Sequence, residues 1–164
     1  MTVIVVMGVS GSGKTTVGTA LAERLGVDYA EADTFHPQAN IDKMSSGHPL
    51  NDEDRQPWLE AIAAWISDHQ SSGGVVTSSA LKHRYRDILR GGGKVWFLHL
   101  HGDRDLLAER MKHRSGHFMP VSLLDSQLAD LEPLRPDEHG LIADIANKPE
   151  DIVETALSAF EDFS

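Results

Sequence analysis

The 164-residue chain contains no cysteine, which excludes disulfide bonds and thiolate metal sites. It also lacks a long hydrophobic run. Its N-terminal apolar stretch, Val3–Met7, is five residues long and leads directly into a glycine-rich segment. Since about 20 consecutive apolar residues are needed to cross a bilayer, we expect no membrane span. We also expect no signal peptide, and we predict a cytoplasmic protein.

Basic residues are few, with 15 Lys and Arg against 25 Asp and Glu and a formal net charge of −10. The acids are concentrated near the C-terminus, where residues 123–164 contain eleven acids and two bases. Residues 1–122 hold 14 acids and 13 bases and are therefore nearly neutral. This balance argues against non-specific binding to nucleic acid or to an anionic membrane. It leaves room for a local basic pocket.

The most informative stretch is a P-loop pattern, Gly8-Val9-Ser10-Gly11-Ser12-Gly13-Lys14-Thr15. The β-branched run Val3–Met7 supplies the strand that such a loop needs before it, and apolar residues at helical spacing follow until Gly26. Lys14 would bring positive charge to the β- and γ-phosphates, and the Thr15 hydroxyl could ligate Mg²⁺. The predicted ATP-binding residues are Gly8, Ser10, Gly11, Ser12, Gly13, Lys14, Thr15 and Thr16. A P-loop alone does not separate kinases from ATPases and GTPases.

Two acids end the second predicted strand, Asp28–Asp33. Glu31 and Asp33 are two residues apart, so in an extended segment they point to the same face. If this strand lies beside the first, both carboxylates approach the metal and the hydroxyl of an acceptor. A solvated strand end is the alternative interpretation.

A helical insertion is predicted over residues 34–70. Pro37 and Gly47 mark a short helix over Pro37–Ser46, followed by a loop. A longer helix begins near Asp52, with Asn51 or Asp52 as its cap, and runs to about Gln70. This pair of helices has the right position in the chain to bind the acceptor.

The third predicted strand, Gly74–Ser78, is not followed by the aspartate that many P-loop ATPases place there, which weakens an ATPase assignment. A helix over Ser79–Arg90 should follow, with basic residues four apart. We predict that Lys82 and Arg86 face the site and that Arg90 lies on the surface. A solvated basic face is the alternative.

The next elements are a strand, Lys94–Leu100, and a helix, Asp103–His113. Arg110 and Arg114 lie near Gly116, so residues 110–132 could form a lid that closes over ATP and stabilises the transferring phosphoryl group. Ordinary surface arginines are the alternative. A helix over Pro120–Leu131, a strand over Leu141–Ala146 and a helix over Pro149–Phe160 complete the chain.

Alternating strands and helices predict one domain, residues 1–164, with a five-stranded parallel sheet between two layers of helices. Ligands should bind at the carboxyl ends of the strands. The P-loop, the Glu31/Asp33 pair and the segment from Ser79 to Lys82 all fall at those ends. The fold class is therefore a three-layer α/β P-loop fold. We expect the helical insertion to bind an acceptor and residues 110–132 to form a lid, as in a P-loop kinase fold.

Several blocks of the chain resemble the gluconate kinases, and the similarity extends over nearly its whole length. The first is the P-loop. The longest is the block Asp33-x-x-His36-Pro37-x-x-Asn40-Ile41-x-Lys43-Met44-x-x-Gly47-x-Pro49-Leu50-x-Asp52-x-Asp54-Arg55-x-Pro57-Trp58-Leu59. The shorter ones are Ser79-Ala80-Leu81-Lys82 with Tyr85-Arg86-Asp87, His117-Phe118-Met119, and Leu123-Leu124-x-Ser126-Gln127. The block beginning at Asp33 is far more specific than the P-loop. The family commonly has Asp-Gly-Asp where this chain has Glu31-Ala32-Asp33, and Cys where it has Ser78.

The resemblance implies ATP-dependent phosphorylation of D-gluconate at its 6-hydroxyl, with Mg²⁺, giving 6-phospho-D-gluconate and ADP. The implied catalytic residues are Lys14, Asp33 and Arg114, with Asp33 orienting or deprotonating the acceptor hydroxyl. Thr15, and Glu31 through water, would hold the metal, and Arg110 would close over ATP. Gluconate would be bound by Asp33, His36, Lys43, Arg55, Lys82, Arg86, His117 and Gln127. Members of the family are often homodimers.

Three other functions compete with this one. A shikimate kinase would have a glycine run after the third strand, and a nucleoside monophosphate kinase would have an Asp-Gly-Phe-Pro-Arg-like turn there. The chain has neither. A P-loop ATPase or regulatory module would need no small acceptor, and its ATP turnover would not respond to sugar acids.

Overall fold

A single five-stranded sheet organises the computed structural model, which describes residues 2–9, 11–48, 50–112 and 121–163. Every strand pair is parallel, and the order across the sheet is β2-β3-β1-β4-β5. This confirms the predicted parallel α/β sheet. The strands are β1 (Val3–Met7), β2 (Asp28–Glu31), β3 (Gly74–Ser78), β4 (Val95–His101) and β5 (Gly140–Asp144).

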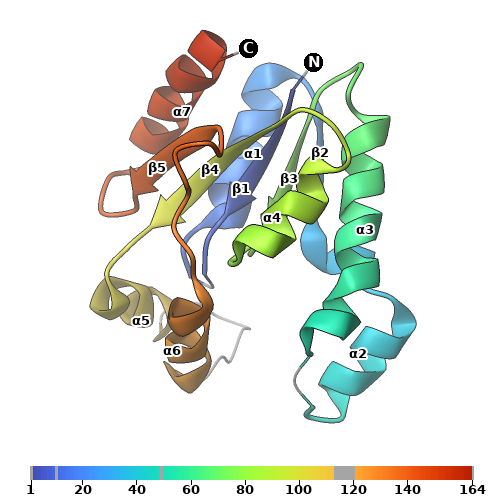
Figure 1. Cartoon of the computed structure of the whole chain (residues 1–164). Coiled ribbons are helices and arrows are strands. Elements are labelled where there is room, and N and C mark those ends of the chain that lie inside the picture. The colour runs from blue at the N-terminus through green and yellow to red at the C-terminus, as the bar shows by residue number, and fades with distance from the viewer. Residues whose placement is uncertain (1, 10, 49, 113–120, 164) are drawn as a thin grey trace.

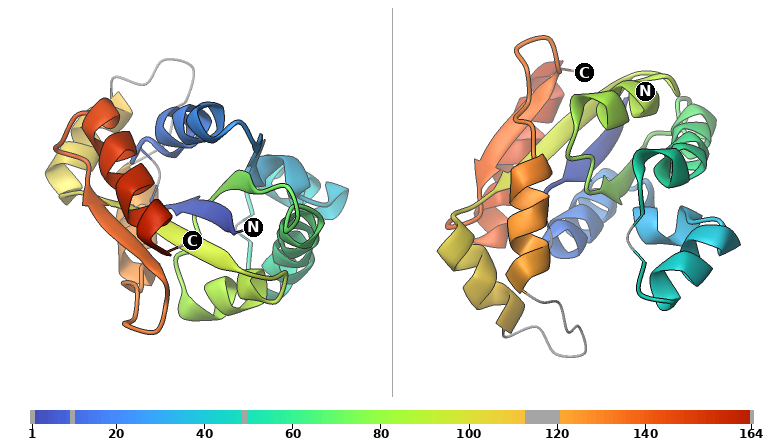
Figure 2. Two further views of the ribbon diagram at one scale, coloured as in Figure 1. Left: turned by 90° about the horizontal axis from the view of Figure 1, so that it is seen from above. Right: turned by 60° about the horizontal axis from the view of Figure 1, so that its bottom comes forward.

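Helices cover both faces of the sheet (Figures 1 and 2). One face carries α1 (Lys14–Leu25) and α7 (Pro149–Phe163), which pack against each other. The other carries α3 (Asp52–Asp68) and α4 (His83–Arg90). The remaining helices lie at the carboxyl edge of the strands, with α2 (Gln38–Ser45) on one side of it and α5 (Arg104–Lys112) and α6 (Val121–Asp130) on the other (Figure 1).

The central strand β1 explains the two-layered core. Ile4 and Val6 pack into the cluster under α1 and α7, while Val3, Val5 and Met7 pack into the cluster under α3 and α4. Successive residues of a strand point to opposite faces, so a strand covered on both faces is apolar throughout. This is why the sequence shows an unbroken apolar run and no alternation.

The structure corrects the prediction for the second strand. β2 ends at Glu31, and residues Ala32–Phe35 form a short 3₁₀ helix. The expectation that Glu31 and Asp33 share one face of an extended strand is therefore wrong. β2 also pairs with β3 and not with β1, so the condition that it lies beside the first strand is not met.

A second correction concerns the start of α4. The helix begins at His83, and the segment from Ser79 to Lys82 is a turn in which Ala80 adopts a φ of 42°. A left-handed backbone is uncommon for a residue with a Cβ and breaks a helix. Lys82 precedes the helix, so it does not share a helical stripe with Arg86 and Arg90.

Other boundaries agree with the sequence prediction within three residues. Asn51 is the N-cap of α3: its side chain accepts from the Asp54 N–H at 2.7 Å, and the Asp54 carboxylate accepts from the Asn51 N–H at 2.9 Å. This reciprocal capping box fixes where the helix begins. Among the described residues, no helix is long and apolar enough to cross a membrane.

Candidate active site

The P-loop has the backbone that phosphate binding requires. Gly8 has a φ of 152°, and a Cβ there would lie 2.7 Å from Ser12 Oγ and 2.8 Å from the carbonyl oxygen of Leu100. Gly13, directly before α1, has a φ of 90°. The loop therefore closes tightly and places the N-terminus of α1, with its N–H groups, at the carboxyl edge of the sheet. Lys14 Nζ donates to the Gly8 carbonyl at 2.7 Å and so folds back over the loop.

A carboxylate meets the P-loop threonine. Thr15 Oγ1 donates to Glu31 Oε1 at 2.9 Å, and the Tyr29 hydroxyl donates to the same oxygen at 3.0 Å. Burial, followed by the hydrogen bond and charge of Glu31, raises the pKa of Tyr29 to about 12. A hydroxyl and a carboxylate in contact form an oxygen donor set that fits Mg²⁺, which is commonly bound by one or two protein groups together with substrate phosphates.

The acid predicted to act on the acceptor lies on the 3₁₀ helix after β2. Asp33 is exposed, while its neighbour Ala32 is buried and accepts a hydrogen bond from Trp58 Nε1 at 2.7 Å. The Trp58 ring stacks on His36, with centroids 4.4 Å apart and planes 10° apart. Asp33 and His36 are therefore held at the carboxyl edge by contacts from α3. Burial lowers the pKa of His36, and the charges of Asp33 and Arg55 act on it with opposite signs.

Several charged groups meet where α3 begins and α4 begins. The Asp52 carboxylate accepts from Tyr85, accepts from Arg84 Nη1 at 3.0 Å, and lies 3.7 Å from Lys82 Nζ and 3.8 Å from Arg55 Nη1. We call these five residues the Asp52 cluster. The hydrogen bond from Tyr85, with the charges of Lys82, Arg84 and Arg55, lowers the pKa of Asp52 despite some burial. Three cations share one carboxylate, so the cluster has an excess of positive charge.

The Asp52 cluster connects two predicted site residues that lie far apart in the sequence. Arg55 donates to the Tyr85 hydroxyl at 3.1 Å, and the Lys82 ammonium lies 5.6 Å from the centre of the same ring. Both cations are only partly exposed. Asp52 and Tyr85 were not among the predicted site residues, although both occur in the motifs quoted above.

Lys43 connects α2 to α3. Its ammonium lies 2.5 Å from the Asp54 carboxylate, which also forms the capping box with Asn51. The hydrogen bond from Lys43 lowers the pKa of Asp54. Nearby, the buried Asn40 donates to the Asp54 carbonyl at 2.8 Å. Lys43 is thus engaged in holding the helical insertion together.

Arg86 does not lie where the sequence prediction placed it. Its side chain is fully buried, with Nε 2.7 Å from the Glu138 carboxylate and Nη1 2.8 Å from the Ala80 carbonyl. A third nitrogen, Nη2, donates to the Glu132 carbonyl at 2.9 Å. Although burial raises the pKa of Glu138, the hydrogen bond from Arg86 and other donors lower it to about 2. Arg86 therefore supports the turn that carries Lys82, and we do not propose it as a gluconate ligand.

The predicted lid is described in part. Arg110 on α5 donates to the carbonyl of Ile145 at 2.5 Å, just beyond β5, and Gln127 lies half-buried on α6. Ser10, Arg114 and His117 lie outside the described residues. Arg104 on α5 donates to Asp125 on α6 at 2.6 Å, which joins the two helices.

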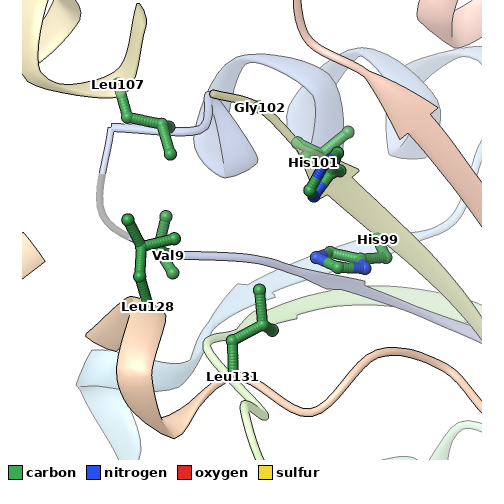
Figure 3. Close-up of a pocket in the computed structure, with 8 residues that line it drawn as sticks. Val9, His99, His101, Gly102, Leu107, Leu128 and Leu131 are labelled. Carbon is green, nitrogen blue, oxygen red and sulfur yellow. The ribbon is translucent and has the colours of Figure 1, made fainter. Parts of the chain in front are cut away.

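A small pocket lies between the P-loop, β4, α5 and α6 (Figure 3). Its apolar wall includes Val9 of the P-loop, Leu107 of α5 and Leu128 of α6, and the imidazoles of His99 and His101 extend from β4. The base of the P-loop therefore packs close to α5 and α6.

His99 is a buried titratable group of this pocket. It is 3% exposed, and its Nδ1 has no hydrogen-bond partner among the described residues. Burial, helped by the charges of His101 and Arg86, lowers its pKa from 6.5 to about 4. The unfolded chain takes up this proton near pH 6.5 and the folded chain only near pH 4. The stability that neutral His99 provides is therefore complete above pH 6.5 and falls as the pH drops to 4.

We expect His99→Leu to reduce the acid sensitivity of the fold. The free energy of unfolding of the parent should fall by up to about 3 kcal/mol more than that of the variant between pH 7 and pH 4. Urea unfolding at a series of pH values measures both curves. If the free energies of unfolding of the two proteins changed in parallel with pH, His99 would take up its proton at the same pH in the folded and the unfolded chain.

The chain matches a family of known domains over most of its length. The family model described as an AAA domain matches residues 4–119. The chain is 46% identical over 161 residues to the gluconokinase of Gluconobacter oxydans (strain 621H), which covers 96% of this chain and 90% of that protein. It is 45% identical over 162 residues to the thermosensitive gluconokinase of Escherichia coli (strain K12), covering 94% and 87% respectively.

Solved structures agree with these relatives. A gluconokinase from Sinorhizobium meliloti 1021 superposes with a TM-score of 0.90 at 48% identity, covering 99% of this chain and 93% of that chain. A shikimate kinase from Aquifex aeolicus reaches a TM-score of 0.62 at 16% identity, over 97% of this chain and 96% of that chain. At that identity the second likeness shows the shared P-loop kinase fold alone.

Proposed function

Because the chain belongs to the gluconokinase family, we propose that it transfers the γ-phosphoryl group of ATP to the 6-hydroxyl of D-gluconate. Residues 4–119 also match the broader AAA domain model. The products are 6-phospho-D-gluconate and ADP. Family membership at 46% identity over nearly the full chain is the observation that carries this proposal. The enzyme is a phosphotransferase with an alcohol group as acceptor.

The donor half of the site follows from the P-loop. The N–H groups at the start of α1, with Lys14, hold the phosphates of ATP, and Thr15 with Glu31 would hold Mg²⁺. When bound, Mg²⁺ neutralises negative charge on the β- and γ-phosphates. Lys14 is close enough to the loop to move from the Gly8 carbonyl to a phosphate oxygen. Arg110 and Arg114 are proposed to close over the nucleotide from the lid.

Asp33 is the proposed general base. It is exposed at the carboxyl edge, and the structure gives it no hydrogen bond or ion pair with a described residue, whereas Glu31 is engaged with Thr15 and Tyr29. Asp33 would accept the proton of the 6-hydroxyl as the oxygen attacks the γ-phosphorus. Phosphoryl transfer depends mostly on positioning and charge stabilisation, so one such carboxylate is sufficient.

The Asp52 cluster is the proposed binding site for the gluconate carboxylate. A carboxylate ligand would compensate the excess positive charge of Arg55, Lys82 and Arg84 around Asp52. An aldose has an aldehyde where gluconate has this carboxylate, so the cluster would favour the sugar acid. His36, beside Asp33, is proposed to bind the chain hydroxyls, and His117 and Gln127 to contact gluconate from the lid region. Lys43 is a further proposed contact once it leaves Asp54.

The test is ADP production with Mg-ATP and a panel of acceptors. We expect stimulation by D-gluconate, with 6-phospho-D-gluconate as product, and none by D-glucose, shikimate or AMP. D-glucose is the matched acceptor because it keeps the 6-hydroxyl and lacks the carboxylate. ADP production at the same rate without an acceptor would overturn the kinase assignment and favour an ATPase.

We also propose a cellular location and an oligomeric state for the enzyme. ATP as phosphoryl donor supports a cytoplasmic location, and neither nucleic acid nor a membrane enters the reaction. A homodimer is expected from the family resemblance, and sedimentation of the purified protein would test it.

A further inference from the structure

Tyr29 makes a contact that the proposed reaction leaves unexplained. It lies on β2 two residues before Glu31, so both side chains lie on the same face of the sheet as α1. Its hydroxyl donates to Glu31 Oε1 at 3.0 Å, and that same oxygen accepts from Thr15 Oγ1 at 2.9 Å. Two hydroxyls thus hold one carboxylate oxygen, one from the sheet and one from the P-loop helix.

The ring of Tyr29 occupies a space that α1 leaves for it. A Cβ at Gly18 would lie 2.9 Å from Tyr29 Cε1 and 3.2 Å from Thr77 Cγ2. Gly18 is a buried residue in the middle of α1, where glycine costs up to about 1 kcal/mol relative to alanine. The missing side chain therefore lets the ring pack between α1 and β3. Packing on two sides fixes the position of the hydroxyl.

A glutamate at this position needs such a restraint. Its carboxylate is carried by three rotatable bonds, and fixing a long side chain costs up to about 2 kcal/mol of conformational entropy. Glu31 is only partly buried. One hydrogen bond from Thr15 leaves the carboxylate free to turn about the oxygen that accepts it, and the second bond, from Tyr29, fixes its direction.

We propose that Tyr29, seated against Gly18, is a positioning residue that holds the Glu31 carboxylate on the Thr15 hydroxyl and so prepares the magnesium-binding pair before nucleotide arrives. This inference rests on the proposed function only in assigning Thr15 and Glu31 to the metal. Outer groups that orient a metal ligand typically change metal affinity by roughly 10- to 100-fold when they are removed.

The test is Tyr29→Phe, which deletes the hydroxyl and keeps the ring. Mn²⁺ binding in the presence of saturating ADP is measured by the loss of the free-ion EPR signal, and metal-free ADP binding is measured by calorimetry. We expect Mn²⁺ to bind roughly 10-fold more weakly to the variant. The affinity for metal-free ADP should stay within twofold, because the P-loop is unchanged.

Tyr85→Phe is the matched control, because it deletes the other tyrosine hydroxyl of the chain. That hydroxyl belongs to the Asp52 cluster, so its loss should leave Mn²⁺ affinity within twofold. Unchanged Mn²⁺ affinity in Tyr29→Phe would overturn the proposal. An equal loss of Mn²⁺ and metal-free ADP binding would also overturn it, since the P-loop itself would then be disturbed.

A second variant tests whether packing against Gly18 positions the Tyr29 ring. Gly18→Ala keeps the hydroxyl but brings a methyl group within 3 Å of the ring, so Tyr29 must shift. Alanine favours the helix, so the fold should be retained, and Mn²⁺ should again bind several-fold more weakly. Parent-like Mn²⁺ affinity in Gly18→Ala would contradict the role given to the space beside Gly18. Neither measurement contains an acceptor, so a failure of the gluconate assignment would be seen separately in the acceptor panel.

Discussion

Asp33→Asn should lower kcat for gluconate phosphorylation by roughly 100-fold or more while ATP binding stays close to that of the parent. A loss of roughly 100-fold is the lower end of the range for a lost general base. The amide keeps the size of the side chain but cannot accept the proton of the attacking hydroxyl. Asp33 is exposed and has no hydrogen bond or ion pair with a described residue, and its neighbour Ala32 is held independently by Trp58. Steady-state kinetics with Mg-ATP and gluconate, together with nucleotide binding by calorimetry, measure both quantities.

Asp42→Asn is the matched control for this variant. Asp42 lies exposed on α2, in the same helical insertion, and accepts a hydrogen bond from Gln38 at 2.9 Å. The substitution makes the same chemical change outside the site, so kcat should stay within twofold. A kcat of Asp33→Asn equal to that of Asp42→Asn would remove Asp33 as the base. A kcat loss accompanied by weaker ATP binding would instead place Asp33 in the donor half of the site.

The parts of the fold that the sequence predicts well are those set by local chemistry. The strands over Val3–Met7 and Gly74–Ser78 have the predicted ends, because an apolar run stops at a glycine or polar loop in both cases. The C-terminus of α1 follows from Gly26, which has the expected left-handed φ of 66°. The capping box at Asn51 is likewise a local pattern.

The parts that it predicts poorly depend on partners far along the chain. Arg86 is surrounded by polar residues in the sequence, and nothing there shows that Glu138, 52 positions later, will bury it. The left-handed Ala80 has no local signal either. By contrast, Tyr29 could have been found, because its spacing of two from Glu31 on a strand puts both on one face. Pairing of β2 with β3 also depends on sheet order, which local patterns do not determine.

The second large effect concerns stability and follows from the buried ion pair of Arg86 with Glu138. Arg86→Met should lower the free energy of unfolding by about 3–5 kcal/mol, since it leaves the Glu138 carboxylate buried without its main partner. The methionine fills much of the same space but also leaves the Ala80 carbonyl without its donor. Arg84→Met, two residues earlier on α4, is the control. Arg84 is largely exposed, and its ion pair with Asp52 should contribute at most about 1 kcal/mol.

The pH dependence of this loss distinguishes a broken ion pair from poor packing. In the parent, the pKa of Glu138 lies at about 2, below its ordinary value of 4.5. The stability from the ionised carboxylate is therefore complete above pH 4.5 and is lost as the pH falls toward 2. Without Arg86, burial raises the pKa of Glu138, so the variant carries a neutral acid at moderately low pH. The difference in the free energy of unfolding between the parent and Arg86→Met should therefore narrow as the pH falls below 4.5. A packing defect would keep this difference constant. Most of the contribution of His99 is common to both proteins, because burial is the main cause of its lowered pKa and the charge of Arg86 is a minor one.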